Sequence, residues 1–172
     1  DVFLRFEEVR WLTGMSVRLN SKGQIFYSHL QSGFSRNMVI KGFHGFFLKF
    51  IQQESTFFRR DLVGCINFEE LKSFNYAGDF YLWKNFAERA KLFSIEAMLA
   101  GFRFREGQLS SEMSSYFYEF SKIRQKRNAL DYCAAFFLKC WDFFAPNTLK
   151  KLVNRRIIYF DLKQNCWVLN LK

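Results

Sequence analysis

Two acidic residues, Asp79 and Glu54, stand where a carboxylate could do chemistry. Asp79 follows Gly78 and opens a segment whose apolar residues recur at helical spacing. One interpretation makes Asp79 the N-cap of that helix, its carboxylate accepting a backbone N–H of the first turn. The other makes Asp79 a general base at the helix N-terminus, walled by Tyr76, Tyr81 and Trp83. The local pattern alone favours the cap, because caps are far commoner than catalytic acids.

Glu54 lies in a polar cluster, residues 52–55, that interrupts the apolar run 46–58. Polar groups inside an apolar run cost free energy unless they are paired or used. One interpretation pairs Glu54 with Arg59 or Arg60 as a structural ion pair. The other assigns it to a functional site together with Asp79, and the local sequence leaves both open.

Composition limits the class of protein. The chain has 172 residues, of which 49% are hydrophobic and 20% aromatic, so it is too apolar to be disordered and can bury a core as one domain. Four cysteines without a C-x-x-C pair and two histidines argue against zinc and predict reduced thiols in a cytosolic setting. The apolar run 133–138 ends at Lys139, well short of a membrane span. No signal peptide is visible, and the first residue is not Met, so we expect a piece of a longer protein.

The net charge of +10 is concentrated in the second half of the chain. Residues 1–79 carry 10 basic and 8 acidic side chains, whereas residues 80–172 carry 16 and 8. This half therefore favours an anionic partner, such as nucleic acid, acidic lipid or a phosphorylated ligand. The densest basic run, residues 122–127, is equally typical of a solvated helix face.

Periodicity predicts a mixed α/β fold that holds these residues in place. Expected strands are a hairpin over 15–29 with its turn at 20–23, and the segments 47–58 and 98–104. Expected helices are 80–91 and a long helix over 111–143, broken at most once, beginning with Ser-Glu cap chemistry. We also expect an irregular loop over 31–45 and a closing hairpin formed by 156–162 and 166–171.

Four sequence pieces occur in one order along residues 9–110: Trp11-Leu12-Thr13-Gly14; Gln52-Gln53-Glu54-Ser55-Thr56-Phe57-Phe58-Arg59-Arg60; Tyr76-Ala77-Gly78-Asp79 with Leu82-Trp83; and Leu99-Ala100-Gly101-Phe102-Arg103 with Gly107-Gln108 and Ser110. Together they resemble the acceptor-side half of bacterial family-2 glycosyltransferases of the GT-A fold. Each piece alone is weak, and the shared order and spacing carry the resemblance. Residues 111–172 resemble the family only loosely, as a long helix and a closing hairpin.

The resemblance implies inverting transfer of a sugar from a nucleotide-sugar donor to an acceptor hydroxyl, in polysaccharide or lipid-linked glycan synthesis. In that family the acid of a (Glu/Asp/Gly)-Asp-x-x-Leu-Trp motif is the base, and here this acid is Asp79. The resemblance implies acceptor binding by Gln53, Glu54, Ser55, Trp11, Tyr76 and Trp83. It implies contacts with the donor diphosphate from Arg103, Arg105 and Gln108. Arg105 stands where relatives often carry His; arginine does not bind a metal, but its fork suits phosphate oxygens.

The family's Asp-x-Asp motif, which holds Mn²⁺ or Mg²⁺ on the diphosphate, does not occur in this sequence. We therefore expect a C-terminal portion of the enzyme, inactive alone, with the cation ligands in a nucleotide-binding half outside this chain. Its single domain, 1–172, would comprise an acceptor and catalytic part, 1–110, and a helical extension with the hairpin, 111–172. The expected location is the cytoplasm, with the inner face of the membrane as an option.

A different class of protein would be a basic, aromatic-rich module that binds a membrane surface or nucleic acid. Nucleic acid is the weaker alternative, because no known recognition motif is present and the order of the four pieces would stay unexplained. A membrane surface is compatible with the enzyme interpretation.

Overall fold

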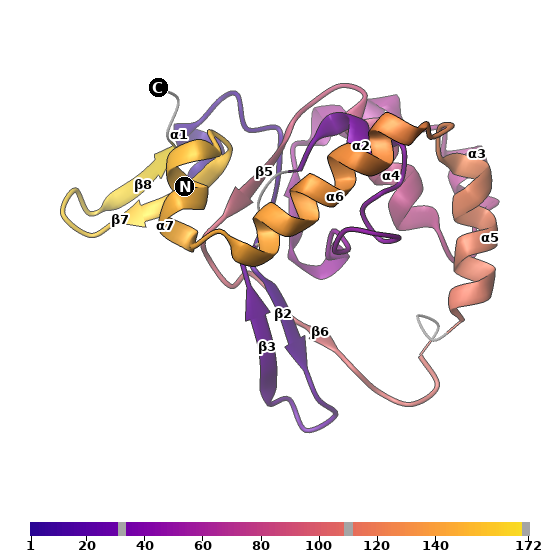
Figure 1. Cartoon of the computed structure of the whole chain (residues 1–172), viewed down its shortest axis with the longest axis horizontal. Coiled ribbons are helices and arrows are strands. Elements are labelled where there is room, and N and C mark those ends of the chain that lie inside the picture. The colour runs from indigo at the N-terminus through magenta and orange to yellow at the C-terminus, as the bar shows by residue number, and fades with distance from the viewer. Residues whose placement is uncertain (31–33, 109–111, 170–172) are drawn as a thin grey trace.

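Two mixed β-sheets organise this computed structural model, which describes residues 1–30, 34–108 and 112–169 (Figure 1). The larger sheet has the strand order β4 (Thr56–Phe58), β1 (Trp11–Thr13), β5 (Leu92–Ile95), β7 (Ile157–Asp161) and β8 (Cys166–Leu169). The smaller sheet has the order β3 (Ile25–His29), β2 (Ser16–Leu19) and β6 (Phe102–Arg103). Neighbours β1–β5, β5–β7 and β2–β6 are parallel and the other pairs antiparallel. The predicted mixed α/β class is confirmed.

The remaining elements are helices. They are α1 (Val2–Arg5), α2 (Arg36–Ile40), α3 (Phe68–Lys72), α4 (Gly78–Ala87), α5 (Met113–Ile123), α6 (Ala129–Phe144) and α7 (Asn147–Val153), with the 3₁₀ turns η1 (Gln53–Ser55) and η2 (Arg60–Cys65). The helix predicted over 80–91 is confirmed as α4, which ends at Ala87. The long helix predicted over 111–143 is interrupted between α5 and α6, where Asn128 and Asp131 form a capping box. The N-cap of α5 is Glu112, and the predicted Ser cap lies outside the described residues.

Both predicted hairpins are confirmed. Strands β2 and β3 pair antiparallel, and the carboxamide oxygen of Asn20 accepts the backbone N–H groups of Lys22 and Gln24 across the turn. Gly23 has φ +83°, a conformation that glycine adopts without strain. In the closing hairpin β7 pairs with β8 from Ile158↔Leu169 to Asp161↔Cys166, and the predicted residues 170 and 171 lie outside the described chain.

Three other expectations are corrected. Of the strand predicted over 47–58 only β4 is formed, because residues 53–55 turn as η1. Of the strand predicted over 98–104 only β6 is formed, and the strand that enters the core is β5, whose four residues are all buried. A strand covered on both faces loses the alternation that reveals a strand in sequence. The loop predicted over 31–45 contains the helix α2.

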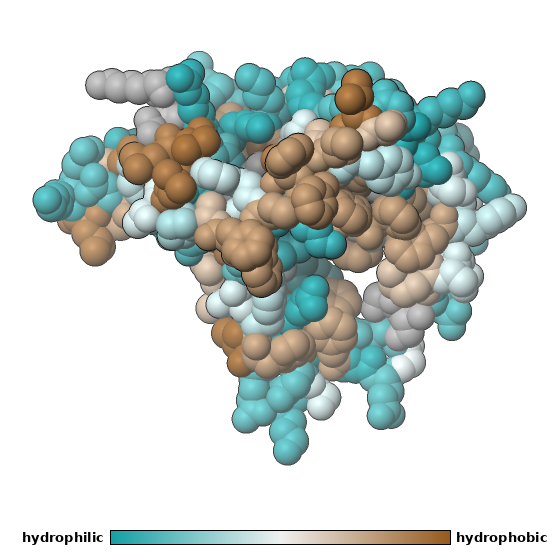
Figure 2. Space-filling model, viewed as in Figure 1, coloured by the Kyte–Doolittle hydropathy of each residue, from teal (hydrophilic) through white to brown (hydrophobic). Residues whose placement is uncertain are grey.

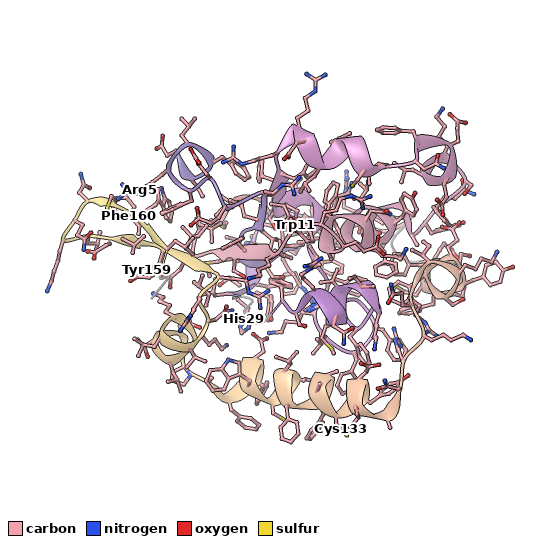
Figure 3. All side chains as sticks on the ribbon, turned by 90° about the horizontal axis from the view of Figure 1, so that it is seen from above. Arg5, Trp11, His29, Cys133, Tyr159 and Phe160 are labelled. Atoms are coloured by element: carbon pink, nitrogen blue, oxygen red, sulfur yellow. The ribbon has the colours of Figure 1, made fainter. Side chains whose placement is uncertain are left out.

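The core lies on both faces of the larger sheet. On one face Trp11 and Leu92 pack with Phe80, Trp83 and Phe86 of α4. On the other face the next residue of each strand, Leu12 and Phe93, packs with residues of α1 and the closing hairpin, among them Val2, Ile158 and Leu169. Trp11 lies in the middle of the body (Figure 3). This packing fixes α4, and with it the position of Asp79.

Candidate functional site

Asp79 stands in the first turn of α4 but does not cap it. The N-cap residue is Ala77, and the Asp79 carboxylate accepts the backbone N–H of Phe80 at 2.6 Å. The interpretation of Asp79 as the N-cap is therefore wrong. The helix N-terminus, with its partial positive charge, still favours a carboxylate at this place.

Glu119 of α5 binds the backbone that leads into α4. Its carboxylate accepts the N–H groups of Asn75, Tyr76 and Ala77 at 3.0, 2.8 and 2.8 Å. Burial works against the charge of Glu119, but these three hydrogen bonds outweigh it and lower its pKa. A sequence pattern could not have found this contact, because Glu119 lies more than 40 residues along the chain from the backbone groups that it binds.

Asp79 differs from the other acids in that its pKa is raised. Burial raises the pKa of Asp79 to about 6, the Phe80 N–H opposes this rise, and the negative charge of Glu54 adds to it. Among the described residues no Lys, Arg or His forms an ion pair with Asp79. The site therefore holds a carboxylate that takes up a proton near neutral pH.

Tyr116 of α5 completes the cluster around Asp79. Burial raises the pKa of Tyr116, and the negative charge of Asp79 raises it further, so its hydroxyl stays protonated. The ring of Tyr116 lies 5.9 Å from that of Phe50, and Phe117 lies 6.1 Å from Phe46. Phe46 and Phe50 are both exposed. Phe50 therefore contacts the tyrosine ring whose hydroxyl interacts with Asp79.

Glu54 and Gln53 are exposed in η1, and Glu54 faces Asp79 closely enough to shift its pKa. Among the described residues Glu54 forms no ion pair with Arg59 or Arg60. Arg59 donates instead to the carbonyl oxygens of Val9, Phe3 and Phe6. The neighbouring Gln52, which the sequence did not single out, holds η1 in place. Its side-chain amide accepts from the N–H of Val17 at 3.1 Å and donates to the Val17 carbonyl at 2.7 Å.

Three predicted acceptor-binding residues are buried, which corrects their proposed role. Trp11 stacks on Trp83 with ring centroids 5.8 Å apart, and both belong to the core. Ser55 is fully buried, with its hydroxyl 3.4 Å from that of Thr13. No acceptor can touch these side chains in this conformation. Tyr76 is half-buried and is held through its backbone by Glu119.

The predicted diphosphate-binding residues lie at the end of β6 and in the loop that follows it. The Gln108 amide accepts the N–H of Arg105 at 3.0 Å and donates to the carbonyl of Arg103 at 2.6 Å, so it closes this loop. A Cβ placed on Gly23 would lie 3.5 Å from Nη2 of Arg103, so this guanidinium reaches the turn between β2 and β3. Both arginines are exposed, and no hydrogen bond or ion pair of the described residues joins them to Asp79.

Within residues 1–30, 34–108 and 112–169 no group of three or more His, Cys, Asp or Glu could hold a metal ion. The ligands of the divalent cation are expected outside this chain, and that prediction stays untested. Comparisons of the chain with protein-family models, with curated proteins and with solved structures found no match. The function has to be inferred from the chemistry of the site and from the order of its motifs.

Proposed function

We propose that this chain supplies the acceptor side of an inverting glycosyltransferase, with Asp79 as the general base. The observation that supports this most is the state of Asp79: a carboxylate in the first turn of α4, without a cation, whose pKa is raised to about 6. A base of this pKa is deprotonated at neutral pH and still accepts a proton readily. The order of the four family-like pieces supports glycosyl transfer as the reaction.

In the proposed reaction an acceptor hydroxyl attacks the anomeric carbon of a nucleotide-sugar. The new C–O bond forms as the bond to the diphosphate breaks, and the configuration at carbon inverts. The hydroxyl proton passes to Asp79, and the nucleoside diphosphate leaves with the electron pair. Exposed Gln53 and Glu54 are placed to bind the acceptor hydroxyls, and Phe50 offers a face for the sugar ring.

The donor side of the site is proposed to lie mainly outside this chain. Arg103 and Arg105 are exposed cations that suit a diphosphate if a nucleotide-binding unit docks beside β6. The ligands for Mn²⁺ or Mg²⁺ would belong to that unit, and no step proposed here depends on the ion. The acceptor is proposed to be a glycan or lipid-linked glycan, handled in the cytoplasm at the inner face of a membrane.

The test is Asp79→Asn in the full-length enzyme, assayed with a panel of UDP-, GDP- and dTDP-sugars for nucleotide release and sugar transfer. We expect kcat to fall by roughly 10²–10⁴-fold, because the proton acceptor is lost. The matched control is Asp61→Asn, which alters an exposed aspartate paired with Arg10. Near-normal transfer by a folded Asp79→Asn enzyme would show that Asp79 is not the base.

A further inference from the structure

Helix α6 directs two acidic residues toward the rest of the protein and exposes its phenylalanines to solvent. Its side chains toward the body are Asp131, Ala135, Leu138 and Asp142, which follow helical spacing. On the opposite side Leu130, Phe137 and Phe144 are 78%, 72% and 77% exposed. In Figure 3 Cys133, which belongs to this outer stripe, points away from the body, whereas His29 lies between α6 and the body. A surface helix normally has the opposite arrangement.

The two inward acids attach α6 to the body through cations. Lys41 donates to both oxygens of Asp131 at 2.7 Å, near the start of the helix. Lys49 and His29 bind Asp142 at 2.9 and 3.0 Å, near its end. Both acids of α6 are therefore bound on its inner side. These contacts fix the orientation of the helix, and its apolar side faces outward.

The outward side continues onto α7 as one apolar area, which we call the outer surface. It consists of Leu130, Cys133, Phe136, Phe137, Phe143 and Phe144 of α6 with Leu149, Leu152 and Val153 of α7. Figure 2 shows the hydrophobic residues of this face gathered over α6 and α7. Contiguous exposed apolar areas of this kind mark contact with a partner or a membrane.

Charge around the outer surface favours an anionic partner. Residues 120–160 contain nine basic side chains and two acidic ones, and the two acids are Asp131 and Asp142. Both acids face inward, so neither lies on the outward side. Of the nine cations, Lys150 is buried against Asp142, Lys151 pairs with Glu96 and Arg156 donates to the Phe34 carbonyl. Lys126 and Lys139 are exposed and form no ion pair among the described residues, and the Lys139 ammonium lies 4.3 Å from the centroid of the Phe47 ring. Arg127 does not contribute, since it donates to the carbonyls of Lys41 and Gly42 and lies over aromatic rings.

We propose that the outer surface binds an anionic lipid bilayer, with α6 lying in the plane of the membrane. Its phenylalanines would enter the boundary between headgroups and acyl chains, and the flanking lysines would meet the lipid headgroups. Among the described residues no helix has the length and hydropathy needed to cross a bilayer, so the contact is with one leaflet. The inference extends the membrane location in the proposed function but does not depend on the reaction.

A second copy of the chain is a less suitable occupant. A two-fold contact would bring the basic side of one molecule against the same basic side of another, and like charges oppose such an interface. The outer surface also offers few polar groups, whereas protein interfaces carry about one hydrogen bond per 100–200 Å². A bilayer needs neither hydrogen bonds nor a shaped counterpart.

The test is co-sedimentation of the full-length protein with vesicles of phosphatidylcholine and phosphatidylglycerol in equal amounts. The variant is Phe137→Ser with Phe144→Ser, which changes two exposed side chains that support no core. We expect the partition coefficient to fall by roughly tenfold or more. The matched control is Phe57→Ser with Phe68→Ser, two exposed phenylalanines of β4 and α3, and it should bind as the parent does.

Each outcome decides the proposal. A parent protein that does not bind these vesicles would overturn it, as would equal binding by both double variants. A parent that is dimeric by light scattering, and that Phe137→Ser with Phe144→Ser makes monomeric without any vesicle binding, would assign the surface to a second copy. Normal sugar transfer to a soluble acceptor by that variant would separate this result from the test of Asp79.

The charge contribution has its own test. Lys126→Gln with Lys139→Gln should weaken vesicle binding about fivefold or more per lysine at low salt, since each lysine near an anionic surface contributes about 1 kcal/mol. The deficit should shrink as salt rises, because salt screens the attraction. Binding that is unchanged at low salt would show that the lysines do not meet the headgroups.

Discussion

Asp79 and Asp142 are the same side chain in two opposite environments. Asp142, in the last turns of α6, is surrounded by His29, Lys49 and Lys150. Burial works to raise its pKa, but the hydrogen bonds from His29 and Lys49 outweigh burial and hold the pKa well below its usual range. Asp79, in the first turn of α4, is half-buried with Glu54 nearby and forms no ion pair among the described residues, and its pKa is raised to about 6.

The difference separates a structural acid from a candidate functional one. A carboxylate held by cations stabilises the fold at neutral pH, and its charge is not available for chemistry. A half-buried carboxylate without a cation lowers the stability of the folded protein when it is ionised. Such groups cluster at functional sites.

Asp142→Ala should lower the free energy of unfolding at pH 7 by roughly 3–5 kcal/mol, because it leaves the buried Lys150 and the half-buried Lys49 without their carboxylate. Urea unfolding measures the change. The control Asp61→Ala removes an exposed pair with Arg10 and should cost less than about 1 kcal/mol. If the two variants lose the same small amount, Asp142 is not a structural anchor and the contrast fails.

His44 should dominate the loss of stability in mild acid. Burial lowers the pKa of His44 from 6.5 to about 4. Between these values the unfolded chain binds a proton that the folded protein does not, so stability falls by up to about 3 kcal/mol as pH is lowered from 6.5 to 4. His44→Gln should flatten this part of the curve in urea unfolding at a series of pH values.

Asp142 affects stability in a lower pH range than His44 does. Its folded pKa is lowered, so its contribution is present above its ordinary value of 3.8 and is lost as pH falls below that value. A curve for His44→Gln that still falls steeply between pH 6.5 and 4 would mean that another group drives the loss.

Asp79→Asn should stabilise the fold at pH 8, by up to about 3 kcal/mol. The folded pKa of Asp79 is raised from 3.8 to about 6, so between these values the folded protein binds more protons and stability falls as pH rises. The neutral amide removes this cost, and the gain should vanish at pH 4, where Asp79 is largely protonated in the folded protein. A variant that is less stable than the parent at pH 8 would show that the charge of Asp79 is compensated.

Glu54→Gln should have the smallest effect on stability and a diagnostic effect on the pH profile. It removes the negative charge that helps to raise the pKa of Asp79. The acidic limb of kcat/KM for sugar transfer should therefore move to lower pH, whatever the change in KM. An acidic limb that stays in place would separate Glu54 from Asp79.

Elements with local signals were predictable from the sequence. The apolar spacing after Asp79 predicted α4, and Asn20 with Gly23 predicted the first hairpin, because helix periodicity and turn chemistry act over a few residues. The sequence also drew attention to Asp79 and Glu54, which the structure brings together. Its motif order determined which reaction to propose.

The tertiary structure alone decided how each side chain is used. Glu119, more than 40 residues away, binds the backbone before α4, so Asp79 is not needed as the cap. Trp11 and Trp83 stack in the core instead of lining a pocket. The orientation of α6 depends on Lys41 and Lys49 from a distant loop, and so does the exposure of its phenylalanines. Burial and ion pairing arise from contacts between segments far apart in the chain, and local sequence patterns do not record such contacts.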